Sequence, residues 1–330
     1  MEKYSVIVPV YNRIDEVDDL LASLAGQTAR NFEVIIVEDG STQPCRKVTG
    51  RYAGKIDIRY FFNEGRSIAR NYGMEHATGT YFVFFDSDCV IPEDYFEKLN
   101  RMSDGHPYDC FGGPDAADAS FTTTQKAINH AMTSFLTTGG IRGGKISLEK
   151  FTPRTFNMGF SRKVYDSVGG FREMFSEDID MSTRIRLAGF SIGLYPELPV
   201  YHKRRVDFRK FLRQVYVFGM SRITLRLLYP DSMKPVHWLP AMFVAGCAAM
   251  ALLAVICSPW WLLPLGLYLS AIFICALIAT KSIVIAAKAV PASIIQLGGY
   301  GCGFLKAYLL KIILGKGRDE AEEIIIRKGK

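Results

Sequence analysis

Short apolar runs alternate with helical patterns over the first half of the chain. Runs rich in β-branched or aromatic residues predict strands at residues 4–10, 32–37, 56–61 and 81–85. Between them, apolar residues at helical spacing predict helices at 14–25 and 67–76. This alternation predicts an α/β fold with a mostly parallel sheet covered by helices on both faces, and the continuous apolar runs suit strands buried on both sides.

The middle of the chain has a less regular pattern. Residues 113–125 are rich in Ala, Asp and Thr and predict a surface loop, and glycine pairs mark 139–150 as a second flexible stretch. Residues 156–168 predict a strand that passes into a short helix. Residues 179–188 predict a helix that acidic residues precede, and Gly189 stands where a C-terminal glycine is expected.

Two long uncharged runs follow, at Leu239–Cys257 and Trp260–Thr280. Each has about the ~20 residues needed to cross the hydrocarbon of a bilayer. The connection between them is very short, so they predict a tight membrane hairpin; a buried soluble core is the alternative. Residues 290–314 combine apolar residues with lysines and glycines, which fits either an interfacial helix or a third span.

The charge of the chain is concentrated before these runs. The formal net charge is +7, and between Tyr201 and Arg226 many basic residues face the single acid Asp207. Such a segment favours the cytoplasmic face of a membrane, although a solvated helix face is the alternative. Scattered cysteines without a CxxC pair fit a reducing compartment, and the first residues lack a signal-peptide pattern. We therefore expect the protein at the cytoplasmic face of the inner membrane.

Acidic residues stand where predicted strands end. Asp86 and Asp88 directly follow the 81–85 run, and ligands of such sheets bind outside the carboxyl ends of the strands. Two carboxylates one residue apart can bind Mg²⁺ or Mn²⁺, which would neutralise a diphosphate leaving group. Asp-x-Asp is also common in solvated turns, so the spacing alone leaves both interpretations open.

Other polar positions have a structural and a functional interpretation. Asp39 either contacts a nucleobase or ribose or belongs to an ordinary acidic turn. Glu177 and Asp178, with Asp180, precede a helix that one of them could cap, while another could deprotonate an acceptor hydroxyl. His202 could bind a metal or a diphosphate, although a lone histidine is more often structural. The sequence has no G-x-G-x-x-G after its first strand, which argues against a dinucleotide oxidoreductase.

In order along residues 4–225, these pieces resemble family 2 glycosyltransferases with the GT-A fold. The resemblance rests on Ile7–Asn12, Val37–Ser41, Asn63–Asn71, Asp86–Asp88, Asn157–Phe160, Gly169–Phe171 and Glu177–Asp180. Glu38 departs from the family pattern, in which an Asp is frequent. No Gln-x-x-Arg-Trp follows Asp178, and processive members hold their growing chain with that motif. The resemblance therefore implies an inverting transfer of a single sugar.

The resemblance also implies roles for individual residues. Asp178 would be the catalytic base. The donor would be bound by Pro9, Tyr11, Asp39, Asn63, Gly65, Arg70 and Asp86. The acceptor side would include Asn157, Gly159 and Glu177. A divalent metal, Mg²⁺ or Mn²⁺, would be held by Asp88, Asp86 and His202.

The same resemblance and the C-terminal pattern divide the chain. The expected parts are a GT-A domain at 1–200 (a nucleotide-sugar and metal half at 1–112 and an acceptor half at 113–200), a basic interface helix at 201–235, a membrane hairpin at 236–281, and an interfacial or third membrane helix with a charged tail at 282–330. The expected partners are a nucleotide-diphosphate sugar, a lipid-linked saccharide acceptor used in cell-surface polysaccharide or glycolipid assembly, and the membrane, but no nucleic acid. A retaining glycosyltransferase, a nucleotidyltransferase and a non-catalytic membrane scaffold remain alternatives.

Overall fold

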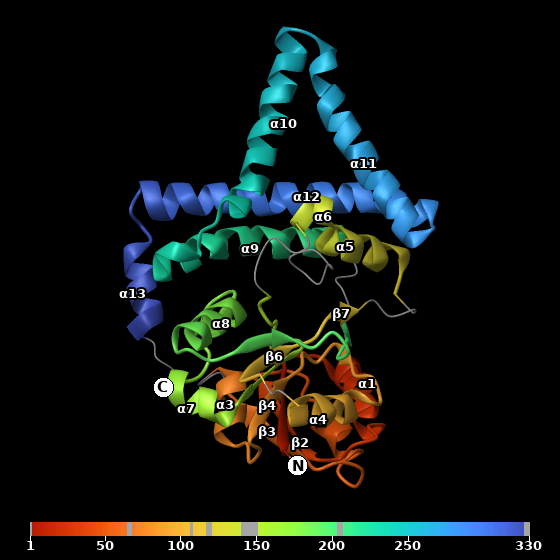
Figure 1. The fold of residues 1–330 in the computed structure, drawn as a ribbon, viewed down its shortest axis with the longest axis vertical. Helices are drawn as coiled ribbons and strands as arrows, with labels where there is room; N and C mark the ends of the chain where they lie inside the picture. The colour runs from red at the N-terminus through yellow and green to blue at the C-terminus, as the bar shows by residue number, and fades with distance from the viewer. Residues whose placement is uncertain are drawn as a thin grey trace. The chain divides into compact units, whose positions relative to one another are not determined.

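The computed structural model describes residues 2–64, 68–105, 108–116, 121–139, 151–202 and 207–326. They form two units, both drawn in Figure 1. Among the described residues, the first unit consists of 2–116 and 151–202, and the second of 121–139 and 207–326. The segment 121–139 thus belongs to the C-terminal unit, although it lies in sequence between two parts of the first unit.

The first unit is built around a seven-stranded sheet with the order β3-β2-β1-β4-β8-β6-β9. Its strands are β1 (Tyr4–Val10), β2 (Phe32–Asp39), β3 (Ile58–Asn63), β4 (Tyr81–Phe84), β6 (Cys110–Gly112), β8 (Met158–Ser161) and β9 (Ile192–Leu194). Strands β1 to β4 pair in parallel, whereas β8 is antiparallel to both β4 and β6. A smaller sheet contains β5 (Cys89–Val90), β10 (Val200–His202) and β7 (Asp115–Ala116).

Helices cover both faces of the main sheet, because alternate strand residues point to opposite sides. On one face, Val6 and Val8 of β1 pack with α1 (Ile14–Ala25) and α4 (Tyr95–Gly105). On the other face, Ile7 packs with residues of α3 (Ala69–Glu75), α7 (Arg162–Val168) and α8 (Glu177–Leu187). A short helix, α2 (Arg46–Gly50), follows β2.

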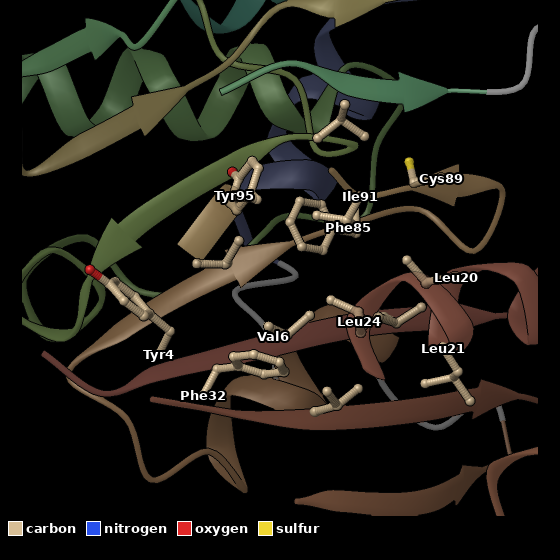
Figure 2. Packing of buried hydrophobic residues seen from close by; sticks show 14 of the residues in the cluster. Tyr4, Val6, Leu20, Leu21, Leu24, Phe32, Phe85, Cys89, Ile91 and Tyr95 are labelled. Carbon is tan, nitrogen blue, oxygen red and sulfur yellow. The ribbon is translucent and has the colours of Figure 1, made fainter. Parts of the chain in front are cut away.

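Aromatic side chains fill much of the first of these two cores. Figure 2 shows Tyr4, Phe32 and Val6 from the strands beside the leucines of α1. Phe32 stacks on Phe96 of α4 at a ring-centroid distance of 4.3 Å, and Phe85 meets Tyr95 edge-on at 5.4 Å. This packing fixes the position of residue 85, directly before the acidic pair that follows β4.

The sequence predicts this architecture well in its first half. The expected α/β fold with a mostly parallel sheet is confirmed, and strand β1 and helix α1 have the predicted bounds. The prediction of a loop at 113–125 is wrong, because Asp115–Ala116 pairs with β10 and α5 begins at Thr123. Thr122 and Gln125 form a capping box there, a local helix signal that the loop prediction overlooked. Most of the second flexible stretch, at 140–150, lies outside the described residues.

The second unit is helical throughout its described residues. Its helices are α5 (Thr123–Thr133), α6 (Phe135–Thr138), α9 (Phe208–Leu228), α10 (Leu239–Ile256), α11 (Leu263–Thr280), α12 (Ile283–Ala307) and α13 (Arg318–Ile326). Three helical stretches are long and apolar enough to cross a membrane, at Pro235–Ile256, Pro259–Thr280 and Ile283–Ile313. The first two contain the pair of apolar runs predicted as a hairpin, and Figure 1 shows α10 and α11 joined by a tight connection.

Glycines allow α9 and α12 to approach each other closely. A Cβ atom added at Gly303 would lie 2.0 Å from the carbonyl oxygen of Tyr216, and one at Gly219 would lie 2.1 Å from that of Tyr300. Contacts advance together along both helices, from Gly299 against Val215 to Lys311 against Thr224, so the helices run in the same direction. Small residues at such crossings let the two backbones pack directly against each other.

Replacing Gly303 with alanine should therefore destabilise the second unit, whereas the same change at Gly298 should not. The Gly303→Ala side chain would collide with the α9 backbone, at an overpacking cost of about 1–3 kcal/mol. A Cβ atom at Gly298 meets nothing within 4 Å, and alanine favours helix more than glycine does. Thermal unfolding of both full-length variants in the same detergent measures the difference. Equal melting temperatures would contradict the tight α9–α12 packing.

Candidate active site

The carboxyl ends of the parallel strands carry the polar residues of the candidate site. Asp39 and Asn63 end β2 and β3 as register partners, and Asn63 Nδ2 donates a hydrogen bond to Asp39 Oδ1 at 3.1 Å. Burial raises the pKa of the Asp39 carboxyl, and the hydrogen bond from Asn63 opposes this shift. Tyr11 follows β1 and is 60% exposed, so its ring is available to a ligand at this edge. Pro9 lies within β1, opposite Val37.

The turn after β1 is tied to the turn after β2. Asn12 has a positive φ of 52°, and its backbone N–H donates to Ser41 Oγ at 2.8 Å. Its side-chain oxygen accepts hydrogen bonds from Thr42 Oγ1 and from the Gln43 N–H. These bonds hold the two turns together beside Tyr11 and Asp39, which gives the corner a defined shape without any ligand.

Glu38, which departs from the family pattern, points into the protein. Its side chain is fully buried, and Oε2 accepts hydrogen bonds from Cys45 N at 2.8 Å and from Tyr60 Oη at 3.3 Å. The carboxylate therefore organises the start of α2. Of the two acids that end β2, Asp39 is the one left at the ligand-binding edge.

Asp86 and Asp88 follow β4 at the same edge of the sheet. Both carboxylates raise the pKa of the Cys89 thiol, after burial as the main cause, so both lie near that buried side chain. Among the described residues no group of three or more His, Cys, Asp or Glu side chains could hold a metal. The aspartate pair fits the chemistry of Mg²⁺ or Mn²⁺ in the form that takes one or two protein carboxylates and completes its coordination with substrate phosphates.

Arg70 connects the acids after β4 with the acids of α8. It lies in the first turn of α3, and Nη2 contacts Asp86 Oδ1 at 2.7 Å while Nη1 donates to Glu177 Oε1. Burial alone would lower the pKa of Arg70, but the charges of Glu177 and Asp86 outweigh it and raise the pKa. Arg70 Nε has no hydrogen-bond partner among the residues that the structure describes. The arginine thus joins a predicted donor residue to a predicted acceptor-side residue.

Glu177 and Asp178 form the first turn of α8, after Ser176 in a left-handed conformation. Burial raises the pKa of the Glu177 carboxyl, and the charge of Arg70 opposes the shift. Asp178 Oδ2 accepts a hydrogen bond from Arg154 Nη1 at 3.1 Å, and Oδ1 accepts one from the Ile179 N–H at 2.8 Å. Each of the two acids is therefore paired with its own arginine.

Two residues expected on the acceptor side, Asn157 and Gly159, make contacts inside the protein. Asn157 is fully buried, its Oδ1 accepts from Tyr95 Oη at 2.7 Å, and its Nδ2 donates to the Leu198 carbonyl at 2.8 Å. A Cβ atom at Gly159 would lie 2.3 Å from the ring of Phe111. The buried amide therefore braces this segment, and the glycine makes room for an aromatic ring, while the place of both residues on the acceptor side stays a prediction.

Of the remaining candidate residues, Asp180 has a structural role, and the His202 side chain and Gly65 lie outside the described part of the chain. Asp180 is fully buried between Arg172 and Arg184, at 3.0 and 2.9 Å, so it stabilises the fold around α8. The backbone of His202 pairs in the small sheet with Cys89, the residue that follows Asp88, and the side chain of His202 lies outside the described part. Gly65 is likewise outside the described residues.

Sequence reasoning missed two residues that organise this site. Arg154 lies 24 positions before Asp178 and carries no motif that marks it. Asn71 lies in a segment that resembles the family but has no predicted role of its own. Its side chain accepts a hydrogen bond from the Phe171 N–H and donates one to the Phe171 carbonyl. Its one available signal was its place one residue after Arg70, about 100° further around the same helical turn, where its side chain is buried.

Comparisons with known proteins agree with this geometry. A family model described as Glycosyl transferase family 2 matches residues 5–169, half of the chain. Glycosyltransferase AglE of Haloferax volcanii is 26% identical over 270 residues, which cover 71% of this chain and 83% of that protein. An uncharacterized glycosyltransferase of Rickettsia felis is 43% identical over 107 residues, and the matched part spans 18% of that longer protein.

A solved structure shows the same fold. The mannosyltransferase PcManGT from Pyrobaculum calidifontis, in complex with GDP-Man and Mn²⁺, superposes with a TM-score of 0.52 at 17% identity, over 90% of this chain and 87% of that one. At this identity the likeness concerns the fold, which is that of GT-A glycosyltransferases. Together with the family match over the sheet and its carboxyl edge, it shows that the chain belongs to glycosyl transferase family 2.

Proposed function

We propose that this protein transfers a single sugar, with inversion, from a nucleotide-diphosphate sugar to a hydroxyl group of a lipid-linked acceptor. The observation that carries the proposal is the double ion pair of Arg70 with Asp86 and Glu177. It joins the acids after β4, which suit a nucleotide diphosphate and its metal, to the acids of α8, which suit an acceptor hydroxyl. Membership of glycosyl transferase family 2 supports the same assignment.

The donor half of the proposal uses the edge formed by β1, β2 and β3. Asp39 accepts hydrogen bonds from the nucleobase or ribose, and its contact with Asn63 holds the carboxylate in place. The exposed ring of Tyr11 offers a flat apolar surface to the base.

Asp86 and Asp88 would hold a divalent cation together with the diphosphate. When bound, such a cation supplies positive charge that stabilises the departing nucleoside diphosphate. The Pyrobaculum calidifontis protein of the same fold binds GDP-Man and Mn²⁺, which supports this part of the proposal. Arg70 keeps Asp86 oriented and adds a second, fixed positive charge beside the same carboxylate.

Asp178 is the base of the proposed reaction. It accepts the proton of the acceptor hydroxyl as the oxygen attacks the anomeric carbon, on the side opposite the leaving diphosphate, so the configuration inverts. Arg154 holds Oδ2, and the backbone N–H of Ile179 holds Oδ1. Both contacts orient the carboxylate, which favours attack from one direction.

A lipid-linked acceptor and the cytoplasmic face of the inner membrane complete the proposal. The apolar helices of the second unit supply the membrane attachment. Basic residues flank the predicted hairpin, with Arg226 and Lys234 before it and Lys281 and Lys288 after it. Such an excess of lysine and arginine favours the cytoplasmic side of a bilayer. An acceptor carried by a lipid would be concentrated in the same two-dimensional surface.

The full-length protein in detergent should release nucleoside diphosphate from one nucleotide sugar when Mg²⁺ or Mn²⁺ and a native lipid extract are present. Asp88→Ala should abolish release, because it removes one of the two cation ligands, whereas Asp104→Ala, an exposed acid at the end of α4, should not. Pyrophosphate as the product would indicate a nucleotidyltransferase, and a retained anomeric configuration a retaining enzyme. Absence of both release and nucleotide binding would favour a scaffold.

Asp178→Asn should lower kcat by about 10²–10⁴-fold, because an amide of the same shape cannot accept the proton. The dissociation constant of the donor should stay nearly unchanged, since Asp178 lies on the acceptor side. Asp166→Asn, an exposed acid on α7, is the matched control and should keep normal turnover. Steady-state rates and calorimetric donor binding provide the two measurements. Full activity of Asp178→Asn would remove this residue as the base.

Arg154→Gln should lower kcat while leaving the KM of the donor unchanged, because Arg154 orients Asp178, which the proposal places on the acceptor side. Arg154→Lys should recover part of the loss, since a lysine keeps the charge but not the fork geometry of the guanidinium. Arg101→Gln, an exposed arginine on α4, serves as the control. A change in donor KM without a change in kcat would contradict the positioning role of Arg154.

A further inference from the structure

Helix α12 has the length and composition of a membrane span, yet its contacts place it elsewhere. The apolar stretch Ile283–Ile313 qualifies for crossing a bilayer by length and composition. Length and composition are equally compatible with a helix that lies along the membrane surface. The distinction depends on which parts of the hairpin α10–α11 the helix touches.

The first turns of α12 pack on the last turns of α11. Ile285, Ala286 and Ala289 form one buried cluster with Ala276, and Leu277 packs against it. These two α11 residues lie within four positions of the end of that helix at Thr280. The contact is therefore made at the open end of the hairpin, not at its tip.

The other end of α12 packs on the first turns of α10. A Cβ atom at Gly301 would lie 2.3 Å from the Pro240 carbonyl oxygen and 2.7 Å from Val244 Cγ2. Phe304 and Ala241 belong to one buried cluster. Helix α12 thus extends from the end of α11 to the start of α10, as Figure 1 shows.

This pattern differs from that of a third span. A helix that followed α11 back across the bilayer would pack along it toward the tip, where Ile256 and Trp260 lie. Those two side chains are 68% and 77% exposed. If α10 and α11 cross the bilayer, their open ends lie at one surface, and a helix that contacts both ends must run along that surface.

The side chains of α12 have the distribution expected of an interfacial helix. Lys288 Nζ donates to Thr123 Oγ1 and Thr124 Oγ1 of α5, at 2.6 and 3.0 Å, so its charge is directed to a neighbouring helix. One face of α12 and of the helical segment that continues it has apolar side chains that are 39–66% exposed. We name it the α12 stripe: Ile283, Val284, Ile294, Leu305 and, just beyond the end of α12, Leu309. An exposed apolar face of this length is suited to the boundary between headgroups and acyl chains.

We propose that α12 lies in the membrane surface with the α12 stripe against the lipid acyl chains, so that the described part of the chain crosses the bilayer twice, through α10 and α11. The occupant of the stripe is the lipid bilayer itself, because the stripe belongs to the helix that closes the base of the membrane hairpin. This inference rests on the proposed membrane attachment through the hairpin, and it does not depend on sugar transfer.

Sided labelling of single cysteines tests the proposal with the full-length chain. Cys257 at the hairpin tip is exposed and serves as a native reporter once Cys247, Cys275 and Cys302 are replaced by alanine. Cys45, Cys89 and Cys110 are buried and stay. Two further variants carry Cys257→Ala together with either Lys281→Cys, before α12, or Lys316→Cys, after it. A variant with Cys257→Ala alone measures background labelling.

A membrane-impermeant maleimide is applied to right-side-out and inside-out vesicles. We expect Lys281→Cys and Lys316→Cys to be labelled from the same side and Cys257 from the opposite side. Labelling of Lys316→Cys from the side of Cys257 would show that α12 spans the bilayer and would overturn the proposal. Labelling of Cys257 and Lys281→Cys from one side would mean that the hairpin does not cross, which overturns the membrane attachment but leaves the transferase activity to its own assay.

A second measurement tests the position of α12 even if Cys257 at the hairpin tip does not react with the maleimide. A lysine near the middle of a spanning helix is strongly unfavourable, whereas an interfacial lysine extends its ammonium group into water. Ile294→Lys should therefore keep the yield of folded protein within about two-fold of the parent, and Leu267→Lys in α11 should lower it by about ten-fold or more. Both parent side chains are exposed in the helical unit. Similar large losses in the two variants would overturn the interfacial position of α12.

Discussion

The candidate site depends on one largely buried cation, Arg70, that lies between carboxylates from two different parts of the chain. Asp86 follows β4, Glu177 begins α8, and both contact the same guanidinium group. Without this cation, burial and the neighbouring acids would oppose ionisation of Glu177 still more, because they raise its pKa even in the presence of Arg70. A planar arginine can satisfy both partners at fixed geometry, which a lysine cannot do as well.

The surrounding structure fixes the positions of Arg70, Asp86 and Glu177 relative to one another. Parallel pairing brings the ends of β1, β2, β3 and β4 to one edge, and the buried rings of Phe85 and Tyr95 fix the chain directly before Asp86. Asn71 holds Phe171, and Asn157 links Tyr95 to the Leu198 carbonyl. Buried amides with both ends occupied act as rigid connectors, because breaking either hydrogen bond would leave an unsatisfied polar group inside the protein.

In the second unit, α9, α12 and α10 are held together by the close approach of their backbones at glycine residues. Gly219 and Gly303 lie directly against the backbone of the partner helix between α9 and α12, and Gly301 lies against the Pro240 carbonyl of α10. Gly299 makes room for the Val215 side chain of α9. In an apolar surrounding such contacts replace the hydrophobic effect as a source of specific packing. Gly299, Gly301 and Gly303, which in the sequence weaken the case for a regular span, therefore have a packing role in the structure.

The sequence by itself determined the strands β1 to β4, the helices α1 and α3, and the acids at the strand ends, because hydrophobic periodicity and strand-end polar residues are local features of the chain. It also determined the two apolar runs of the hairpin. Only the tertiary structure decided that Glu38 turns inward while Asp39 stays at the edge, that Asn157 braces the core, and that Arg154 reaches Asp178. The position of α12 across the base of the hairpin was likewise beyond the sequence. These outcomes depend on contacts between residues far apart in the chain, and local patterns carry no information about which distant partner a side chain meets.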